Sequence, residues 1–209
     1  MFERKTYKKQ ALASLKSQWL DSCLLSTIFL AISGLAGCIS IFGGIIISTA
    51  IWGILSVALN SVFMKYCSNP ESQKISFPSF LDSIGTHWLP SILGALWFLL
   101  WTFLWSLLFF IPGVVKGYSY SMMFFVLAEN PKIGIEKSMN ISKILTSGHK
   151  ADLFSLHLSF FGWWLLCLFT SGVGFIALLP YFKMTNLNAY YDLKKMAFNE
   201  RKLSPADFA

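Results

Sequence analysis

The stretch CLLSTIFLAISGLAGCISIFGGIIISTAIWGILSVALNSV, from Cys23 to Val62, contains no charged residue. As one helix it would be about 60 Å long, whereas the hydrocarbon core of a bilayer is only about 30 Å thick. The chain must therefore turn back within this stretch, and the glycines of SGLAGCISIFGG (residues 33–44) suit a turn. We predict two membrane-spanning helices here, near residues 20–40 and 44–66.

The whole chain has the composition of a membrane protein. Of its 209 residues, 55% are hydrophobic and 13% are charged, whereas a soluble domain carries about 25% charged residues. We expect an all-α fold, a polytopic membrane helix bundle of about six transmembrane helices in one integral membrane domain, residues 1–209. Residues 1–19 would form a basic amphipathic segment and residues 193–209 a cytoplasmic tail. The four further spans are predicted near residues 88–110, 113–129, 152–170 and 173–192.

The basic residues predict the orientation in the membrane. All of the 17 Lys and Arg residues except Lys116 and Lys183 fall in four segments, which six spans would place on one side. The positive-inside rule makes that side the cytoplasm, with both termini on it. We therefore expect a multi-pass membrane protein. Its basic face predicts contact with anionic lipid headgroups, and charge that flanks apolar runs in this way does not indicate nucleic acid.

Short interfacial helices are expected between the spans. Residues 5–20 place Tyr7, Ala11, Leu15 and Trp19 on one helical face and lysines on the rest, as in a helix that lies on the inner leaflet. Residues 75–88 have a similar pattern and predict a second such helix. A third is expected from Asn130 as N-cap and Pro131 as the first helical residue.

The segment IPGVVKGYSYS, Ile111 to Ser121, interrupts an apolar region. Pro112 and Gly113 predict the outer turn between the third and fourth spans. Gly113, Gly117 and Ser121 are spaced by four and predict a face for close helix packing, as does Gly162 in the fifth span. Lys116 is either a lysine that reaches the interface from a span end or a functional charge inside the bundle.

The last predicted span combines an apolar half with a polar half. Pro180 opens the backbone, and Lys183 follows near mid-depth. A broken helix with polar groups at this depth is how many transporters form a binding site. The candidate intramembrane polar site consists of Lys183, Thr185, Asn186, Asn188 and Tyr190. The alternative is that the span ends early, which would place Lys183 at the interface.

The C-terminal half resembles a known family. The carrying segments are FFIPGVVKGYSYSMMFFVLAENP (residues 109–131) and SGHKADLFSLHLSFFGWWLLCLFTSGVGFIALLPYFKMTNLNAYYDL (residues 147–193). They contain a Pro-Gly-x-x-Lys step, an Asn-Pro turn, Gly-His-Lys, Leu-Ser-Phe-x-Gly-Trp and a Pro-Tyr pair in order. This pattern resembles the bacterial domain-of-unknown-function-975 family. The resemblance implies a multi-pass bacterial membrane protein and implies no activity.

The residues do not predict an enzyme. Paired carboxylates within spans, a nucleophile with a histidine base, HExxH and nucleotide loops are all missing from the sequence. We expect no catalytic residue, no bound metal and no cofactor. The first hypothesis is a non-enzymatic protein that acts through intramembrane helix contacts with a membrane protein or toxin, as an immunity protein or as an accessory of a membrane complex. The alternative is a transporter of a small solute or lipid.

Overall fold

All secondary structure in the described residues is helical. The computed structural model describes residues 4–68, 74–108, 110–170 and 172–208, with the backbone alone at 36–43, 106–108, 110–112 and 206. The all-α expectation is confirmed for this part of the chain. The helices are α1 (Arg4–Leu15), α2 (Trp19–Gly43), α3 (Ile45–Ser68), α4 (Phe77–Leu108), α5 (Phe110–Tyr120), α6 (Met123–Glu129), α7 (Ile135–Thr146), α8 (Lys150–Leu158), α9 (Phe161–Phe169), α10 (Gly174–Asn199) and the 3-10 helix η1 (Pro205–Phe208).

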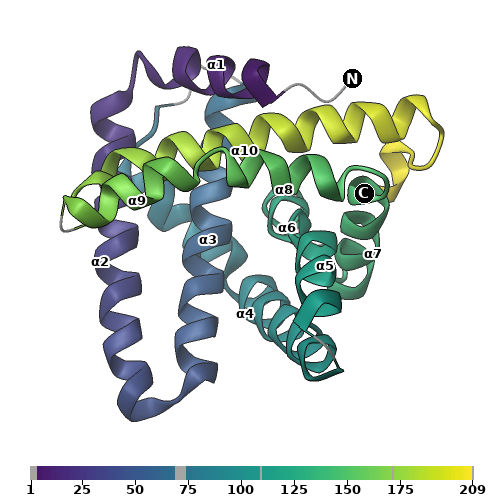
Figure 1. Ribbon diagram of the computed structural model, residues 1–209, viewed down its shortest axis with the longest axis horizontal. Coiled ribbons are helices and arrows are strands. Elements are labelled where there is room, and N and C mark those ends of the chain that lie inside the picture. The colour runs from purple at the N-terminus through teal and green to yellow at the C-terminus, as the bar shows by residue number, and fades with distance from the viewer. Residues whose placement is uncertain (1–3, 69–73, 109, 171, 209) are drawn as a thin grey trace.

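Two tight turns lie where the sequence predicts them. Gly44, between α2 and α3, has φ of +97°, and Gly172, between α9 and α10, has φ of +87°. This left-handed conformation is costly for residues that carry a Cβ atom. The first apolar stretch is therefore folded into an antiparallel helical hairpin, as its length requires (Figure 1).

The expected separate helix at residues 75–88 is wrong. Instead, α4 is one helix from Phe77 to Leu108, with Pro90 inside it. Proline lacks the N–H that the carbonyl four residues earlier would accept, but such breaks are tolerated in membrane helices that have hydroxyl side chains nearby. Here the carbonyl that loses its partner is that of Thr86, and the Ser91 hydroxyl donates to the next carbonyl oxygen, that of His87.

The predicted turn at Pro112 and Gly113 is also misplaced. Both residues lie in the first turn of α5, which begins at Phe110. Proline is suited to that turn because the first N–H groups of a helix have no partner within it. Two of the predicted spans each consist of two helices. The span predicted at residues 113–129 is interrupted at Ser121 and Met122, between α5 and α6, and the span predicted at residues 152–170 is interrupted at Ser159 and Phe160, between α8 and α9.

The third interfacial helix begins later than expected. Asn130 is the C-cap of α6, and its side-chain oxygen accepts the Lys132 N–H at 2.9 Å. Gly134 is the N-cap of α7, so Asn130 and Pro131 belong to the connecting turn. The side chain of Ser142 on α7 donates to the Ser119 carbonyl oxygen of α5 at 2.8 Å, which fixes α7 against the preceding helix.

The long helix α10 lies across the α2–α3 hairpin rather than beside it (Figure 1). It contacts α1, α2, α3, α7 and α9. The buried face of α1 consists of Tyr7, Ala11 and Leu15, three of the four residues predicted from their spacing, and α1 packs alongside α10. The fourth, Trp19, is instead the first residue of α2 and is 37% exposed. In this arrangement α10 is the element that joins the N-terminal hairpin to the C-terminal helices.

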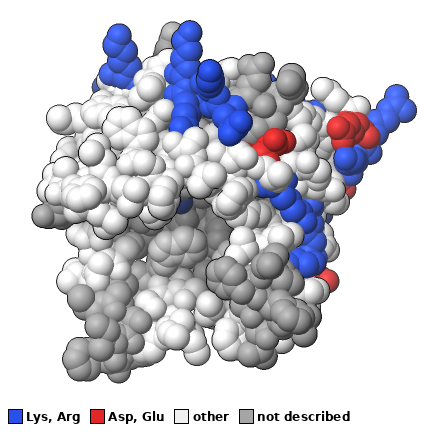
Figure 2. Space-filling model, viewed as in Figure 1, with Lys and Arg blue, Asp and Glu red and all other residues white. Residues whose placement is uncertain are grey.

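Charge and hydropathy divide the molecule into two parts. Lys and Arg side chains, drawn in blue, gather in the upper part and along the right-hand edge of Figure 2, and none of those drawn lies in its lowest part. Among the described residues, three segments are long and apolar enough to cross a membrane: Ile45–Ser68, Phe77–Trp105 and Lys150–Phe169. A fourth qualifies if α1 and residues 19–35 of α2, bent by 102°, count as one span. The chain therefore has the helices of a membrane protein, and the six-span count is not confirmed.

Candidate functional site

The ammonium group of Lys183 lies between α10 and the N-terminal hairpin. Its Nζ donates to the Ser56 hydroxyl of α3 at 3.0 Å and lies 5.8 Å from the centre of the Phe29 ring of α2. The side chain is half-buried. Asn60, one helical turn after Ser56 on the same face of α3, has a buried Oδ1 with no hydrogen-bond partner among the described residues.

Thr185 and Asn186 are directed toward other neighbours. Thr185 donates its hydroxyl to the Tyr181 carbonyl oxygen at 2.8 Å, a bond within α10 itself. Asn186 donates its amide to the Phe182 carbonyl oxygen at 2.8 Å. Its Oδ1 then accepts from Nε2 of His157, on α8, at 2.7 Å. Asn186 therefore ties α10 to α8, and the Nδ1 atom of His157 is left as an acceptor.

The last two predicted site residues connect α10 with α1 and α6. Asn188 donates to the Tyr7 carbonyl oxygen at 3.3 Å. Tyr190 is fully buried and donates its hydroxyl to Oε2 of Glu129 at 2.6 Å, while Lys194 pairs with Oε1 of the same carboxylate. The Tyr190 ring stacks on Phe125, with the ring centres 5.5 Å apart.

These five residues do not form one converged site. Each polar group that leaves α10 meets a different helix: α3 for Lys183, α8 for Asn186, α1 for Asn188 and α6 for Tyr190. Hydrogen bonds between helices satisfy polar groups that lipid cannot satisfy. The polar half of α10 therefore serves mainly to join helices.

Two of the predicted packing glycines, Gly117 and Gly162, are not at close contacts. A Cβ atom added at Gly117 or Gly162 would meet no neighbour within 4 Å. The other predicted packing and turn residues have different surroundings. Gly113 is buried, and the Ser121 hydroxyl donates to the Tyr118 carbonyl oxygen, three residues earlier, at 2.8 Å. The side chain of Pro112 lies outside the described residues. The close approach occurs instead at Gly53, where an added Cβ would overlap the Cβ of Ala95 and lie 2.9 Å from the Ser91 carbonyl oxygen.

Lys116 faces the preceding helix. Its Nζ lies 4.4 Å from the centre of the Trp105 ring of α4, in a cation–π contact. The contact lies within the α4–α5 pair. The geometry gives Lys116 a packing contact and places it in none of the pockets described below.

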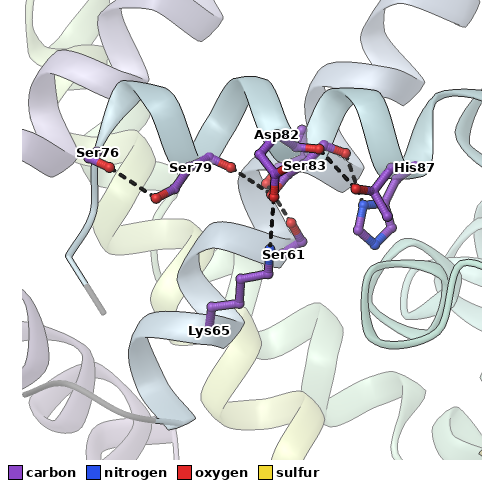
Figure 3. Close-up of polar contacts among 9 residues, drawn as sticks. Ser61, Lys65, Ser76, Ser79, Asp82, Ser83 and His87 are labelled. Atoms are coloured by element: carbon purple, nitrogen blue, oxygen red, sulfur yellow. Dashed lines mark hydrogen bonds and ion pairs between the residues drawn. The ribbon is translucent and has the colours of Figure 1, made fainter. Parts of the chain in front are cut away.

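A polar pocket of about 500 Å³ lies where α3, α4, α6 and α10 meet. Figure 3 shows Ser61 and Lys65 of α3 directed toward Asp82 and Ser83 of α4, with His87 one turn further along α4. Nζ of Lys65 and Oδ2 of Asp82 are 3.9 Å apart, on an exposed part of the surface. The lining consists of Ser61, Met64, Lys65, Ser68, Thr86, His87, Ala128, Glu129, Pro131 and Tyr191.

His87 is the most enclosed titratable group of this pocket. It is 5% exposed, and its Nδ1 lies 2.9 Å from the Ser83 carbonyl oxygen. A carbonyl can only accept a hydrogen bond, so Nδ1 must carry a proton. The sequence analysis did not select His87. A signal was present, because Ser79, Ser83, His87 and Ser91 recur every four residues and so lie on one face of α4.

A second pocket, of about 380 Å³, is apolar. Trp19 of α2, Trp163 of α9 and Tyr181 of α10 are among its lining residues. Among the described residues, no group of three or more His, Cys, Asp or Glu side chains could hold a metal ion.

Comparison with known proteins identifies the C-terminal half. The family model described as "Protein of unknown function (DUF975)" matches residues 107–197. Residues 107–197 belong to the DUF975 family. The DUF975 segment includes α5 to α9 and nearly all of α10, with Lys183, Glu129 and Tyr190. The polar pocket lies between the DUF975 segment and the N-terminal part of the chain. Glu129 and Tyr191 belong to the DUF975 segment, whereas Lys65 and His87 precede it. No curated protein and no solved structure matches the chain.

Proposed function

We propose that this chain is a non-enzymatic protein of the bacterial cytoplasmic membrane that acts by contact with a partner in the membrane. The observation that carries the proposal is the outer face of α9. Its aromatic and leucine side chains are uncovered, and Phe169 is 88% exposed. The polar groups of α10 that a solute site would need instead form hydrogen bonds between helices. Protection against a membrane-active toxin or peptide, and service as an accessory of a membrane complex, both fit such a surface.

The charge distribution supports both termini in the cytoplasm. Six spans remain our prediction, although α10 is not among the segments that qualify by hydropathy and crosses α2 and α3 in Figure 1. Six spans place Val173 at the outer surface. A cysteine at Val173 should then react with an impermeant thiol reagent in intact cells, and reaction only after lysis would place α8 to α10 along the cytoplasmic face.

The contact proposal predicts selective crosslinking from α9. A photoreactive residue in place of Phe169 should give a discrete protein adduct in living cells. The same residue in place of Phe103, an exposed apolar position of α4 (63% exposed), is the matched control and should give only lipid adducts. Loss of the gene should also raise sensitivity to membrane-active peptides. Lipid adducts alone at both positions, with unchanged sensitivity, would contradict the proposal.

A second candidate function is transport of a small solute or lipid, which the Lys183 ammonium favours. This half-buried cation has Ser56 as a hydrogen-bond partner, and one helical turn after Ser56 lies Asn60, whose Oδ1 has no partner among the described residues. Lys183→Met keeps the length of the side chain and removes its charge. Transport predicts a folded protein that has lost solute-dependent thermal stabilisation, whereas a structural role predicts a changed midpoint of unfolding without any solute.

A further inference from the structure

Three hydroxyl groups of the polar pocket face it as hydrogen-bond acceptors. Ser61 donates to the Ala58 carbonyl oxygen at 3.1 Å, Ser68 to that of Met64 at 3.0 Å, and Thr86 to that of Asp82 at 3.0 Å. Each hydroxyl has one proton and two lone pairs. Because the proton is used within the helix, what each oxygen can offer a ligand is a lone pair.

His87 adds an acceptor of another kind. Its Nδ1 proton is donated to the Ser83 carbonyl oxygen, so in the neutral ring Nε2 has no proton and can only accept. The ring is held by this bond and by its burial within α4. A ligand in the pocket would therefore meet a fixed nitrogen lone pair beside the hydroxyl oxygens.

The pocket also contains one carboxylate and two helix C-termini. Glu129 lines it, and its carboxylate retains lone pairs beyond those used by Tyr190 and Lys194. The pocket also lies at the C-terminal ends of α3, at Ser68, and of α6, at Glu129. The carbonyl end of a helix carries a partial negative charge that favours cations. Lys65 opposes this field, but it is paired with Asp82 and partly exposed.

We propose that this pocket binds a primary ammonium group. Such a group has three N–H donors and one positive charge, which matches a set of acceptors that has few protons to give. The ammonium is carried either by the ethanolamine headgroup of a phospholipid or by a small soluble amine. A quaternary ammonium has the same charge but no N–H donor, so the pocket discriminates against it.

The lipid source is tested in nanodiscs that contain equal amounts of phosphatidylethanolamine and phosphatidylcholine with the same acyl chains. Native mass spectrometry of the released protein counts the lipids that stay bound. We expect phosphatidylethanolamine to be retained in preference, and Thr86→Val to weaken its binding by about tenfold through loss of one acceptor to a charged donor. Thr27→Val is the control, because this exposed threonine of α2 makes the same bond, to the Cys23 carbonyl oxygen at 2.8 Å.

The soluble source is tested in nanodiscs of phosphatidylcholine alone. Methylammonium should raise the midpoint of thermal unfolding and tetramethylammonium should not, and Lys65→Met should strengthen the methylammonium effect. A response to methylammonium assigns the site to soluble amines, and a preference for phosphatidylethanolamine without that response assigns it to the lipid. Equal retention of both lipids with equal responses to both cations would overturn the proposal. So would a phosphatidylethanolamine preference that Thr86→Val leaves unchanged.

Discussion

Replacing Gly53 with alanine should destabilise the protein by about 1–3 kcal/mol or more, the usual cost of overpacking a closely packed interior. The added Cβ would overlap the Cβ of Ala95 and lie 2.9 Å from the Ser91 carbonyl oxygen. One of these atoms belongs to the backbone of α4, so a side-chain rotation cannot relieve the contact. The helices α3 and α4 would have to move apart, and both are among the segments able to span the membrane.

The control for this prediction is Gly34→Ala in α2. An added Cβ at Gly34 meets no neighbour within 4 Å, and alanine is the better helix former by about 1 kcal/mol. Thermal unfolding in one detergent should therefore show a lower midpoint for Gly53→Ala and an unchanged or higher one for Gly34→Ala. Equal midpoints for Gly53→Ala and the unsubstituted protein would show that α3 and α4 do not approach at this glycine.

The second large effect is expected at Tyr190. Tyr190→Phe removes a hydrogen bond of 2.6 Å to the Glu129 carboxylate, and bonds to charged groups contribute about 1.5–3 kcal/mol. Tyr190→Ala also removes a fully buried ring that stacks on Phe125. It should cost about 3–5 kcal/mol, as large-to-small changes at buried aromatic residues do.

Tyr66→Phe is the matched comparison for Tyr190→Phe. Tyr66 is also buried, but both partners of its hydroxyl are neutral: it donates to the Ser14 carbonyl oxygen at 2.7 Å and accepts from the Ser17 hydroxyl at 2.9 Å. Hydrogen bonds between neutral groups contribute less than bonds to a charged group, about 0.5–1.5 kcal/mol each, so Tyr66→Phe should lower the unfolding midpoint less. A double-mutant cycle of Tyr190→Phe with Glu129→Gln should show coupling between the two sites. Additive effects would mean that the hydroxyl and the carboxylate do not interact.

The helices and the hairpin turns could be predicted from the sequence because they follow from local properties. Apolar length determines where a membrane helix can run, and the turns at Gly44 and Gly172 require a conformation that glycine adopts at little cost. The buried face of α1 follows from the spacing of Tyr7, Ala11 and Leu15. The match of the family model to residues 107–197 confirms the resemblance read from the C-terminal motifs.

Contacts between helices could not be predicted in the same way. Small residues at a spacing of four allow close packing, but they do not determine whether another helix passes near them. A helix passes close to Gly53 and none passes close to Gly117, although both residues are glycines within helices. The polar residues of α10 were recognised as a group. Their division among four partners follows from the direction of α10 across the hairpin, which periodicity does not reveal. His87 was overlooked because a single histidine among apolar residues is usually structural.

The position of α10 in the chain also bears on how the protein is made. The helices that α10 contacts, from α1 to α9, all leave the ribosome before it does. Until α10 is in place, Ser56, Glu129 and His157 lack the partners that it brings them. Nascent chains that stop before Gly174 would therefore expose several unsatisfied polar groups at once. Membrane quality control would have a chemical signal by which to distinguish unfinished chains from finished ones.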